Sequence, residues 1–307
     1  MTNSDDRAAD RASRKFPIIG LTWLGLLAVL LPLLAIVSPI NHDETQYIAA
    51  AYLASEGLTP YRDFLYLQTP YQIYAFAPLF SVFAEHGFLA ARIVTGMIGA
   101  AILAFVYLAQ RKMHVDAARA VICCILLWLS HTFIFSVTVV RNDALPALLL
   151  AAAILIAASR PNTAGAGRFR SIPWLLTGVL LGLATGTKIS FAAPALAFAG
   201  YPVWAYILKA MPLREAITRS ATIGVGLGAA LLPLIWFRDA APLAFDYGNF
   251  GYHAEAPLAW YAANGLEDRL TLVAKMRDVL LTLARGPALF ALIIYGWLRI
   301  QSIRARE

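Results

Sequence analysis

The sequence predicts an all-α polytopic membrane protein with about eight transmembrane helices and further helices that lie on the membrane surface. Hydrophobic residues make up 60% of the 307 residues and charged residues only 14%, whereas a soluble domain carries about 25% charged residues. Several apolar runs approach the roughly 20 residues with which a helix spans a bilayer. These runs lack the alternating polarity of barrel strands, which argues against a membrane β-barrel.

The polar and basic residues 1–16 are expected to form a cytoplasmic tail that leads into an uncleaved first helix. The hydrophobic pattern predicts eight spans, at residues 17–38, 89–110, 118–136, 143–158, 173–190, 192–208, 221–237 and 280–299. The expected organisation is a transmembrane module over 17–237 that includes an outer loop at 39–88. A second outer loop at 238–279 precedes the last helix and a basic cytoplasmic tail at 280–307.

Residues 71–84 are apolar but short, and they contain Pro78. If this segment does not span, 16 of the 25 lysines and arginines lie on the cytoplasmic side. If it spans, four basic segments move to the outer side. The positive-inside rule favours the first arrangement, so residues 71–84 are expected to lie at the outer surface or to dip into it. The net charge of +7 then reflects topology, and no nucleic-acid partner is expected.

Asp43 follows the first predicted span and is the candidate catalytic residue. Asn41 can cap a helix, and Glu44 three residues later completes a capping box; the helix is expected to run through Ala54 and to end at Gly57. A carboxylate at such a helix start, beside the membrane, can act as a general base toward a hydroxyl group. The alternative is that Asp43 only complements the helix dipole.

Three further charged residues are expected on the same side as Asp43. Arg141 and Asp143 stand between two spans, where they could bind substrate or could serve as a helix cap and a surface anchor. Lys188 stands near the outer end of the fifth span. A lysine there is costly unless it reaches the interface or finds an anion such as a lipid phosphate.

The five histidines and two cysteines show no metal-ligand spacing, and no glycine-rich phosphate loop occurs. His253 and Glu255, with neighbouring aromatic residues, could line a sugar site or could belong to an aromatic belt at the interface. Glycines spaced by four residues, which let membrane helices approach closely, are Gly178, Gly182, Gly186, Gly224 and Gly228.

Five motifs occur in order along the chain: Asp43-Glu44-Thr45-Gln46-Tyr47, Pro60-Tyr61-Arg62-Asp63-Phe64, Thr69-Pro70, Arg141-Asn142-Asp143 and Gly182-Leu183-Ala184-Thr185-Gly186-Thr187-Lys188. Together they resemble the GT-C superfamily of integral membrane glycosyltransferases, in particular its protein O-mannosyltransferase and lipid A aminoarabinose-transferase branch. The resemblance covers roughly residues 17–237. It departs at Gln68-Thr69-Pro70, where related enzymes often carry a charged pair before two prolines.

The resemblance implies a GT-C-like fold in a bacterial inner (plasma) membrane, with the active site on the outer side. It implies transfer of a sugar from a polyprenyl-phosphate donor to a hydroxyl group of a lipid, glycan or protein acceptor. Asp43 is then the catalytic base, and one base with backside attack implies inversion. No cofactor is obligatory, although a divalent cation could assist. The expected substrate contacts are Glu44, Tyr47, Arg62, Asp63, Gln68, Tyr71, Arg141, Asp143 and Lys188.

Two other classes of function remain open from the residues alone. A transporter or flippase for a lipid or solute would also use ionisable residues inside the membrane. It would be expected to show inverted repeats and broken central helices, which the sequence does not display. A non-catalytic membrane subunit of a larger complex is the third class.

Overall fold

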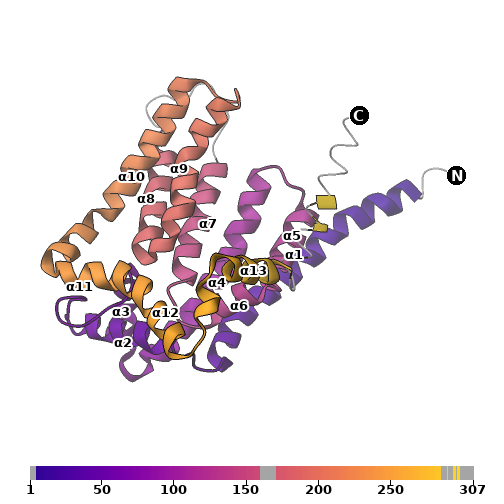
Figure 1. Ribbon diagram of the computed structural model, residues 1–307. Coiled ribbons are helices and arrows are strands. Elements are labelled where there is room, and N and C mark those ends of the chain that lie inside the picture. Colours follow the sequence, from indigo (N-terminus) through magenta and orange to yellow (C-terminus); the bar gives the residue numbers. More distant parts are fainter. Residues whose placement is uncertain (1–4, 160–170, 285–288, 290–292, 295, 298–307) are drawn as a thin grey trace.

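The computed structural model describes residues 5–159, 171–284, 289, 293, 294, 296 and 297, and most of them are helical (Figure 1). These residues contain no β-strand. The helices of the bundle are α1 (Asp5–Val37), α4 (Gly87–Lys112), α5 (Ala117–Trp128), α6 (His131–Thr138), α7 (Ala144–Ala158), α8 (Ile172–Thr187), α9 (Ala192–Ile207) and α10 (Leu213–Ala240). The helices outside the bundle are α2 (Glu44–Ser55), α3 (Tyr71–Phe83), α11 (Pro242–Asp246), α12 (Tyr252–Ala263) and α13 (Leu272–Leu283).

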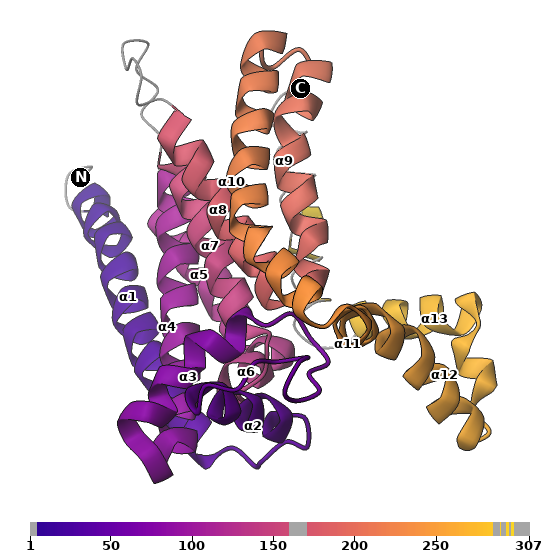
Figure 2. The ribbon, with the colours of Figure 1, turned by 90° about the vertical axis from the view of Figure 1, so that its left-hand side faces the viewer.

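The bundle helices pack in the order α1, α4, α7, α8, α10 and α9, as Figure 2 shows. Helices α2, α3, α11 and α12 lie at one end of the bundle, and the connections from α4 to α5 and from α9 to α10 lie at the other. The charge distribution predicts that the loops at 39–88 and 238–279 lie on one side of a membrane and that the two connections lie on the other. In the structure these two groups are at opposite ends of the bundle.

Three described stretches are long and apolar enough to cross a membrane: Gly20–Val37, Tyr71–Lys112 and Leu213–Ala240. A fourth would be α5 with α6, which are bent against each other by 69°. Helices α7 and α8 are apolar but shorter. The chain is thus compatible with an integral membrane protein, whereas the predicted number of eight spans is not confirmed. The predicted span at 280–299 falls partly outside the described residues.

The ambiguous segment at 71–84 forms α3, which continues toward α4 through a short 3₁₀ turn at Ala84–His86. Ala84 has a positive φ of 44°, and this separates the direction of α3 from that of α4. Helix α3 lies beside α2 at the end of the bundle (Figure 2). Because the backbone turns at Ala84, the apolar helix α3 can lie at the end of the bundle even though α4 follows it almost immediately in the sequence.

Helix α2 begins at Glu44, with Asp43 and not Asn41 at its N-cap position. The side-chain oxygen of Asn41 accepts a hydrogen bond of 3.0 Å from the Asp43 N–H, and Glu44 Oε2 accepts one of 3.3 Å from the Asn41 N–H. The expected cap is therefore shifted, because Asn41 forms a local turn with Asp43. Gly57 ends the helix as predicted, with a φ of 86° that suits glycine.

Helices α8 and α10 are in very close contact through glycines. A Cβ atom at Gly178 would lie 2.1 Å from the Ile223 oxygen, and one at Gly226 would lie 2.3 Å from the Leu175 oxygen. Gly182 is similarly close to α10. The prediction for Gly224 and Gly228 was wrong, because both have open space around them; the face of α10 that meets α8 carries Gly226 instead.

Candidate functional site

A buried ion pair between Glu44 and Arg92 anchors the first loop to the bundle. Arg92 Nε donates to Glu44 Oε1 at 2.9 Å, and Arg92 Nη2 donates to Glu44 Oε2 at 2.7 Å. The Val140 N–H also donates to Glu44 Oε1, at 3.0 Å. Arg92 further donates to the carbonyl oxygens of Ala35, at 3.0 Å, and Pro39, at 3.1 Å, at the end of α1. Three segments that are far apart in the sequence are thus tied together at one point.

Glu44, which the resemblance assigns to substrate contact, lies inside this anchor. Its side chain is fully buried, and both of its carboxylate oxygens accept hydrogen bonds from Arg92. Breaking a buried pair of this kind would leave one charge without compensation. The predicted substrate contact of Glu44 is therefore not supported by its surroundings, because the side chain is fully buried and paired with Arg92.

Asp43, Arg141, Asp143 and Lys188 form one continuous chain of ion pairs. Arg141 Nη1 donates to Asp43 Oδ2 at 2.5 Å, and Arg141 Nε donates to Asp143 Oδ2 at 3.3 Å. Lys188 Nζ donates to the other oxygen of Asp143, Oδ1. The exposed fractions of these four side chains lie between 22% and 31%. The candidate base and the candidate phosphate-binding cations are thus in direct contact, in a setting that solvent or a ligand can reach.

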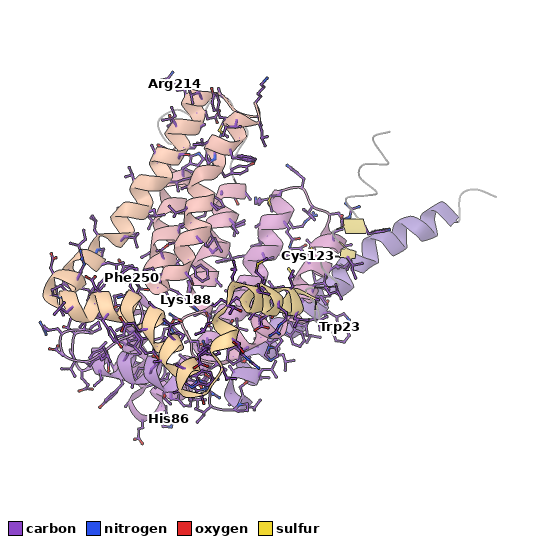
Figure 3. All side chains as sticks on the ribbon, viewed as in Figure 1. Trp23, His86, Cys123, Lys188, Arg214 and Phe250 are labelled. Carbon is purple, nitrogen blue, oxygen red and sulfur yellow. The ribbon has the colours of Figure 1, made fainter. Side chains whose placement is uncertain are left out.

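Breaks in the helices place these charges at the same end of the bundle. Asp43 holds the N-cap position of α2, and Asp143 holds that of α7. Lys188 follows the last residue of α8 in an extended conformation, with φ −147° and ψ 118°, so that its side chain leaves the helix end. Figure 3 shows Lys188 near the end of the bundle that faces α11 and α12.

A second polar chain runs beside the charges and joins both predicted outer loops. Tyr47 Oη donates to Asn142 Oδ1 at 3.0 Å, and Asn142 Nδ2 donates to Gln68 Oε1 at 3.1 Å. His253 Nε2, from α12, lies 3.3 Å from Gln68 Nε2 and 2.9 Å from the Leu67 oxygen. Burial raises the pKa of Tyr47 above its usual range, which keeps its hydroxyl neutral and able to donate.

Asn142 is the residue of this chain that the sequence did not single out as a substrate contact. It is 1% exposed and uses both ends of its amide to join Tyr47 to Gln68. The signal available in the sequence was its position between Arg141 and Asp143. Its role there is to hold the loop that carries both charges against α2 and the 59–70 segment.

Arg62 and Asp63 lie in an exposed turn and bind each other. Arg62 Nη2 donates to Asp63 Oδ2 at 2.8 Å, and the Thr59 N–H donates to the same oxygen at 2.7 Å. The hydrogen bond from Arg62 lowers the pKa of Asp63 to about 2. These contacts stabilise the turn. Within the part of the chain that the structure describes, no hydrogen bond or ion pair joins the pair to Asp43 or Lys188.

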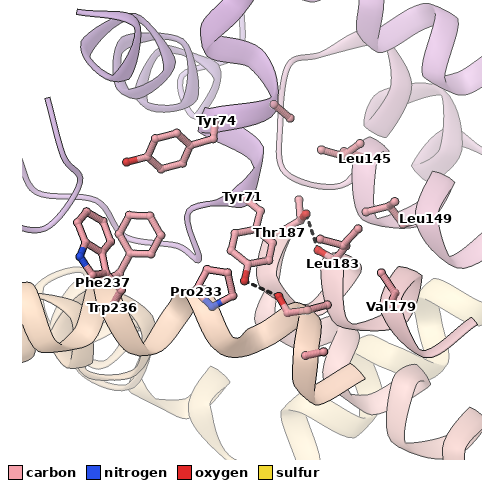
Figure 4. A pocket seen from close by; sticks show the side chains of 13 residues that line it. Tyr71, Tyr74, Leu145, Leu149, Val179, Leu183, Thr187, Pro233, Trp236 and Phe237 are labelled. Atoms are coloured by element: carbon pink, nitrogen blue, oxygen red, sulfur yellow. Dashed lines mark hydrogen bonds between the residues drawn. The ribbon is translucent and has the colours of Figure 1, made fainter. Parts of the chain in front are cut away.

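Tyr71 lines an apolar groove of about 810 Å³ between α3, α7, α8 and α10 (Figure 4). Its hydroxyl donates to the Ala230 oxygen at 2.6 Å, and its ring packs where a Cβ atom at Gly186 would be. Leu145 and Thr187 also line the groove. Leu145 lies two residues after Asp143, and Thr187 immediately precedes Lys188, so the groove adjoins the chain of ion pairs.

The described residues contain no group of three or more His, Cys, Asp or Glu side chains that could hold a metal ion. The two carboxylates of the site, Asp43 and Asp143, are instead paired with Arg141 and Lys188. Comparison with known proteins finds no matching family, no matching curated protein and no matching solved structure.

Proposed function

We propose that this protein is a membrane glycosyltransferase that moves a sugar from a polyprenyl-phosphate donor to an acceptor hydroxyl group on the outer side of the membrane. The observation that supports the proposal most is the contact between Asp43 and Arg141 beside Lys188 and an apolar groove. A candidate base, two cations and a lipid-sized groove are the parts that this reaction needs.

The donor phosphate binds Lys188 and Arg141, and the polyprenyl chain lies in the groove lined by Tyr71, Leu145 and Thr187. Burial of an apolar chain contributes about 25 cal/mol per Å², which favours a lipid over a soluble sugar phosphate. Cations placed at the leaving phosphate stabilise the charge that develops on it. A phosphate leaving group is already a stable anion, so no strong general acid is required.

Asp43 accepts the proton of the acceptor hydroxyl group. The hydroxyl oxygen then attacks the anomeric carbon from the face opposite the phosphate, and the carbon–oxygen bond to phosphate breaks with its electron pair on phosphate. The products are the inverted glycoside and the polyprenyl phosphate, and the proton remains on Asp43. Because Arg141 is paired with Asp43, its movement to the donor phosphate frees Asp43 to act as a base.

Transfer is tested with the purified full chain, radiolabelled polyprenyl-phosphate sugars and a cell-envelope extract as the source of acceptors. Asp43→Asn is expected to reduce transfer by about 10²- to 10⁴-fold, as is typical for loss of a general base. Asp278→Asn changes an exposed aspartate of α13 and serves as the matched control. Equal transfer by Asp43→Asn and by the unaltered protein would rule out this mechanism.

A lipid transporter or flippase is the second candidate function. This candidate uses only the cations Arg141 and Lys188 and the apolar groove, because moving a lipid phosphate across the membrane requires no base. This candidate predicts movement of a labelled polyprenyl phosphate across proteoliposomes without formation of a glycoside. Transfer of label to an acceptor by the same preparation would exclude it.

A further inference from the structure

Asp143 is held in the manner of a bound anion. Its two carboxylate oxygens contact two different cations: Oδ1 accepts from Lys188 Nζ, and Oδ2 accepts from Arg141 Nε at 3.3 Å. Guanidinium and ammonium groups bind carboxylates and phosphates through the same charge-assisted hydrogen bonds. The position of the Asp143 carboxylate is therefore one that a phosphate group could occupy with the same two partners.

The charges of this group balance one another. The carboxylates of Asp43 and Asp143 face the cations of Arg141 and Lys188, and the exposed His42 lies 3.2 Å from Asp43. Both cations are already paired with carboxylates, so an incoming phosphate competes with a carboxylate for them. Asp143 is the carboxylate that contacts both cations, whereas Asp43 contacts Arg141 alone among them.

The place of Asp143 beside the groove indicates which anion can displace it. Leu145 and Thr187, close in sequence to Asp143 and Lys188, line the apolar groove. A phosphate that carries a long apolar chain gains free energy from burial of that chain, and this gain offsets the loss of the Asp143 ion pairs. A free phosphate has no such gain and faces the same loss.

We propose that Asp143 is a built-in competitor of the donor phosphate: it occupies the cations until a lipid-linked phosphate displaces it. Asp143 thereby weakens the binding of every phosphate, and a phosphate that carries an apolar chain offsets this cost through the groove. The identification of that phosphate as the sugar donor's rests on the proposed function. The proposal differs from a role of Asp143 as a direct substrate contact, because it assigns Asp143 an effect that opposes binding.

The test is the binding of two probes, a short-chain polyprenyl phosphate and inorganic phosphate, to the purified full chain in detergent. Asp143→Asn keeps the size of the side chain and removes its charge. It is expected to bind both probes about 10-fold more tightly, equivalent to about 1.4 kcal/mol. Asp143→Glu keeps the carboxylate and is expected to bind both probes as the unaltered protein does. Lys188→Met is expected to bind both more weakly.

Folding of the Asp143→Asn protein is not expected to suffer from loss of a helix cap, because Asp143 makes no side-chain capping hydrogen bond to α7. The midpoint of thermal unfolding checks this, and Asp143→Ala provides a second neutral variant. The proposal is overturned if Asp143→Asn and Asp143→Ala both bind the probes no more tightly than the unaltered protein does. That result would support a direct or positioning role for Asp143.

The two probes separate this proposal from the function on which it rests. If no variant binds the polyprenyl phosphate but Asp143→Asn gains affinity for inorganic phosphate, the donor class is wrong and the competing role of Asp143 holds. If the unaltered protein binds the polyprenyl phosphate and neutral variants gain nothing for either probe, the donor class holds and the competing role is wrong.

Discussion

Arg141 Nη1 donates a hydrogen bond of 2.5 Å to Asp43 Oδ2, although the two residues are 98 positions apart in the chain. The pair joins the start of α2 to the segment between α6 and α7. In the proposed reaction one partner accepts a proton and the other binds the leaving phosphate. Donor binding and release of the base are then linked through a single ion pair, which means that the donor must bind before proton transfer.

The sidedness of the candidate site can be measured by cysteine labelling. In a background in which the exposed Cys123 is replaced by serine, Glu56→Cys is expected to react in intact cells with a reagent that does not cross the membrane. Gly165→Cys is expected to react only after the cells are opened, because the positive-inside rule predicts that 160–170 lie in the cytoplasm. The opposite pattern would place the site on the cytoplasmic side.

Loss of the Glu44 charge is expected to destabilise the protein strongly. Glu44→Gln leaves Arg92, which is 4% exposed, as a buried charge without its partner. Removal of one partner of a buried pair costs roughly 3–5 kcal/mol, and denaturant unfolding in detergent measures this cost. Glu56→Gln, an exposed change just beyond the same helix, is the control and is expected to have no measurable effect. Equal stability of the two variants would show that the anchor is unimportant.

The charge of Lys188 is expected to contribute directly to donor binding. Lys188→Met keeps most of the apolar stem and removes the charge. It is expected to lower the affinity for the polyprenyl phosphate by about 10- to 150-fold, which corresponds to roughly 1.5–3 kcal/mol for a charge-assisted hydrogen bond. Lys188→Arg, which keeps the charge, is expected to retain most of the affinity. A lysine that only reaches toward the interface would leave binding unchanged in both variants.

The position of Tyr71 in the groove is expected to depend on Gly186. A Cβ atom at Gly186 would lie 2.1 Å from the Tyr71 ring, so Gly186→Ala forces the ring to move and destabilises the protein by about 1–3 kcal/mol. Donor affinity should fall with it, because Tyr71 lines the groove.

The matched control for this change is Gly228→Ala on α10, where nothing lies within 4 Å of the added atom. Alanine is favoured over glycine inside a helix by up to about 1 kcal/mol. The control is therefore expected to leave stability unchanged or to raise it, as measured by thermal unfolding. If the Gly186→Ala protein is as stable as the Gly228→Ala protein and binds the donor as tightly, the contact between Gly186 and Tyr71 is contradicted.

The sequence by itself determined the features that depend on neighbouring residues. Runs of apolar residues predicted where along the chain the bundle helices occur, because such a run is a property of one continuous stretch of sequence. Gly57 marked the end of α2, because the positive φ that it adopts is a local property of the backbone. The local signal at Asn41 was less reliable: its side chain was expected to cap α2, but it accepts a hydrogen bond from the Asp43 N–H in a local turn.

Only the tertiary structure decided which polar residues meet and which of them are buried. Asp43 and Glu44 are adjacent in the sequence, yet Glu44 is sealed against Arg92 while Asp43 remains partly exposed beside Arg141. Asn142 acquired its role from Tyr47 and Gln68. These partners lie on separate helices and loops, and the direction of each side chain follows from how the helices rotate and pack. No local pattern of residues encodes that rotation, so the site became visible only when the bundle was assembled.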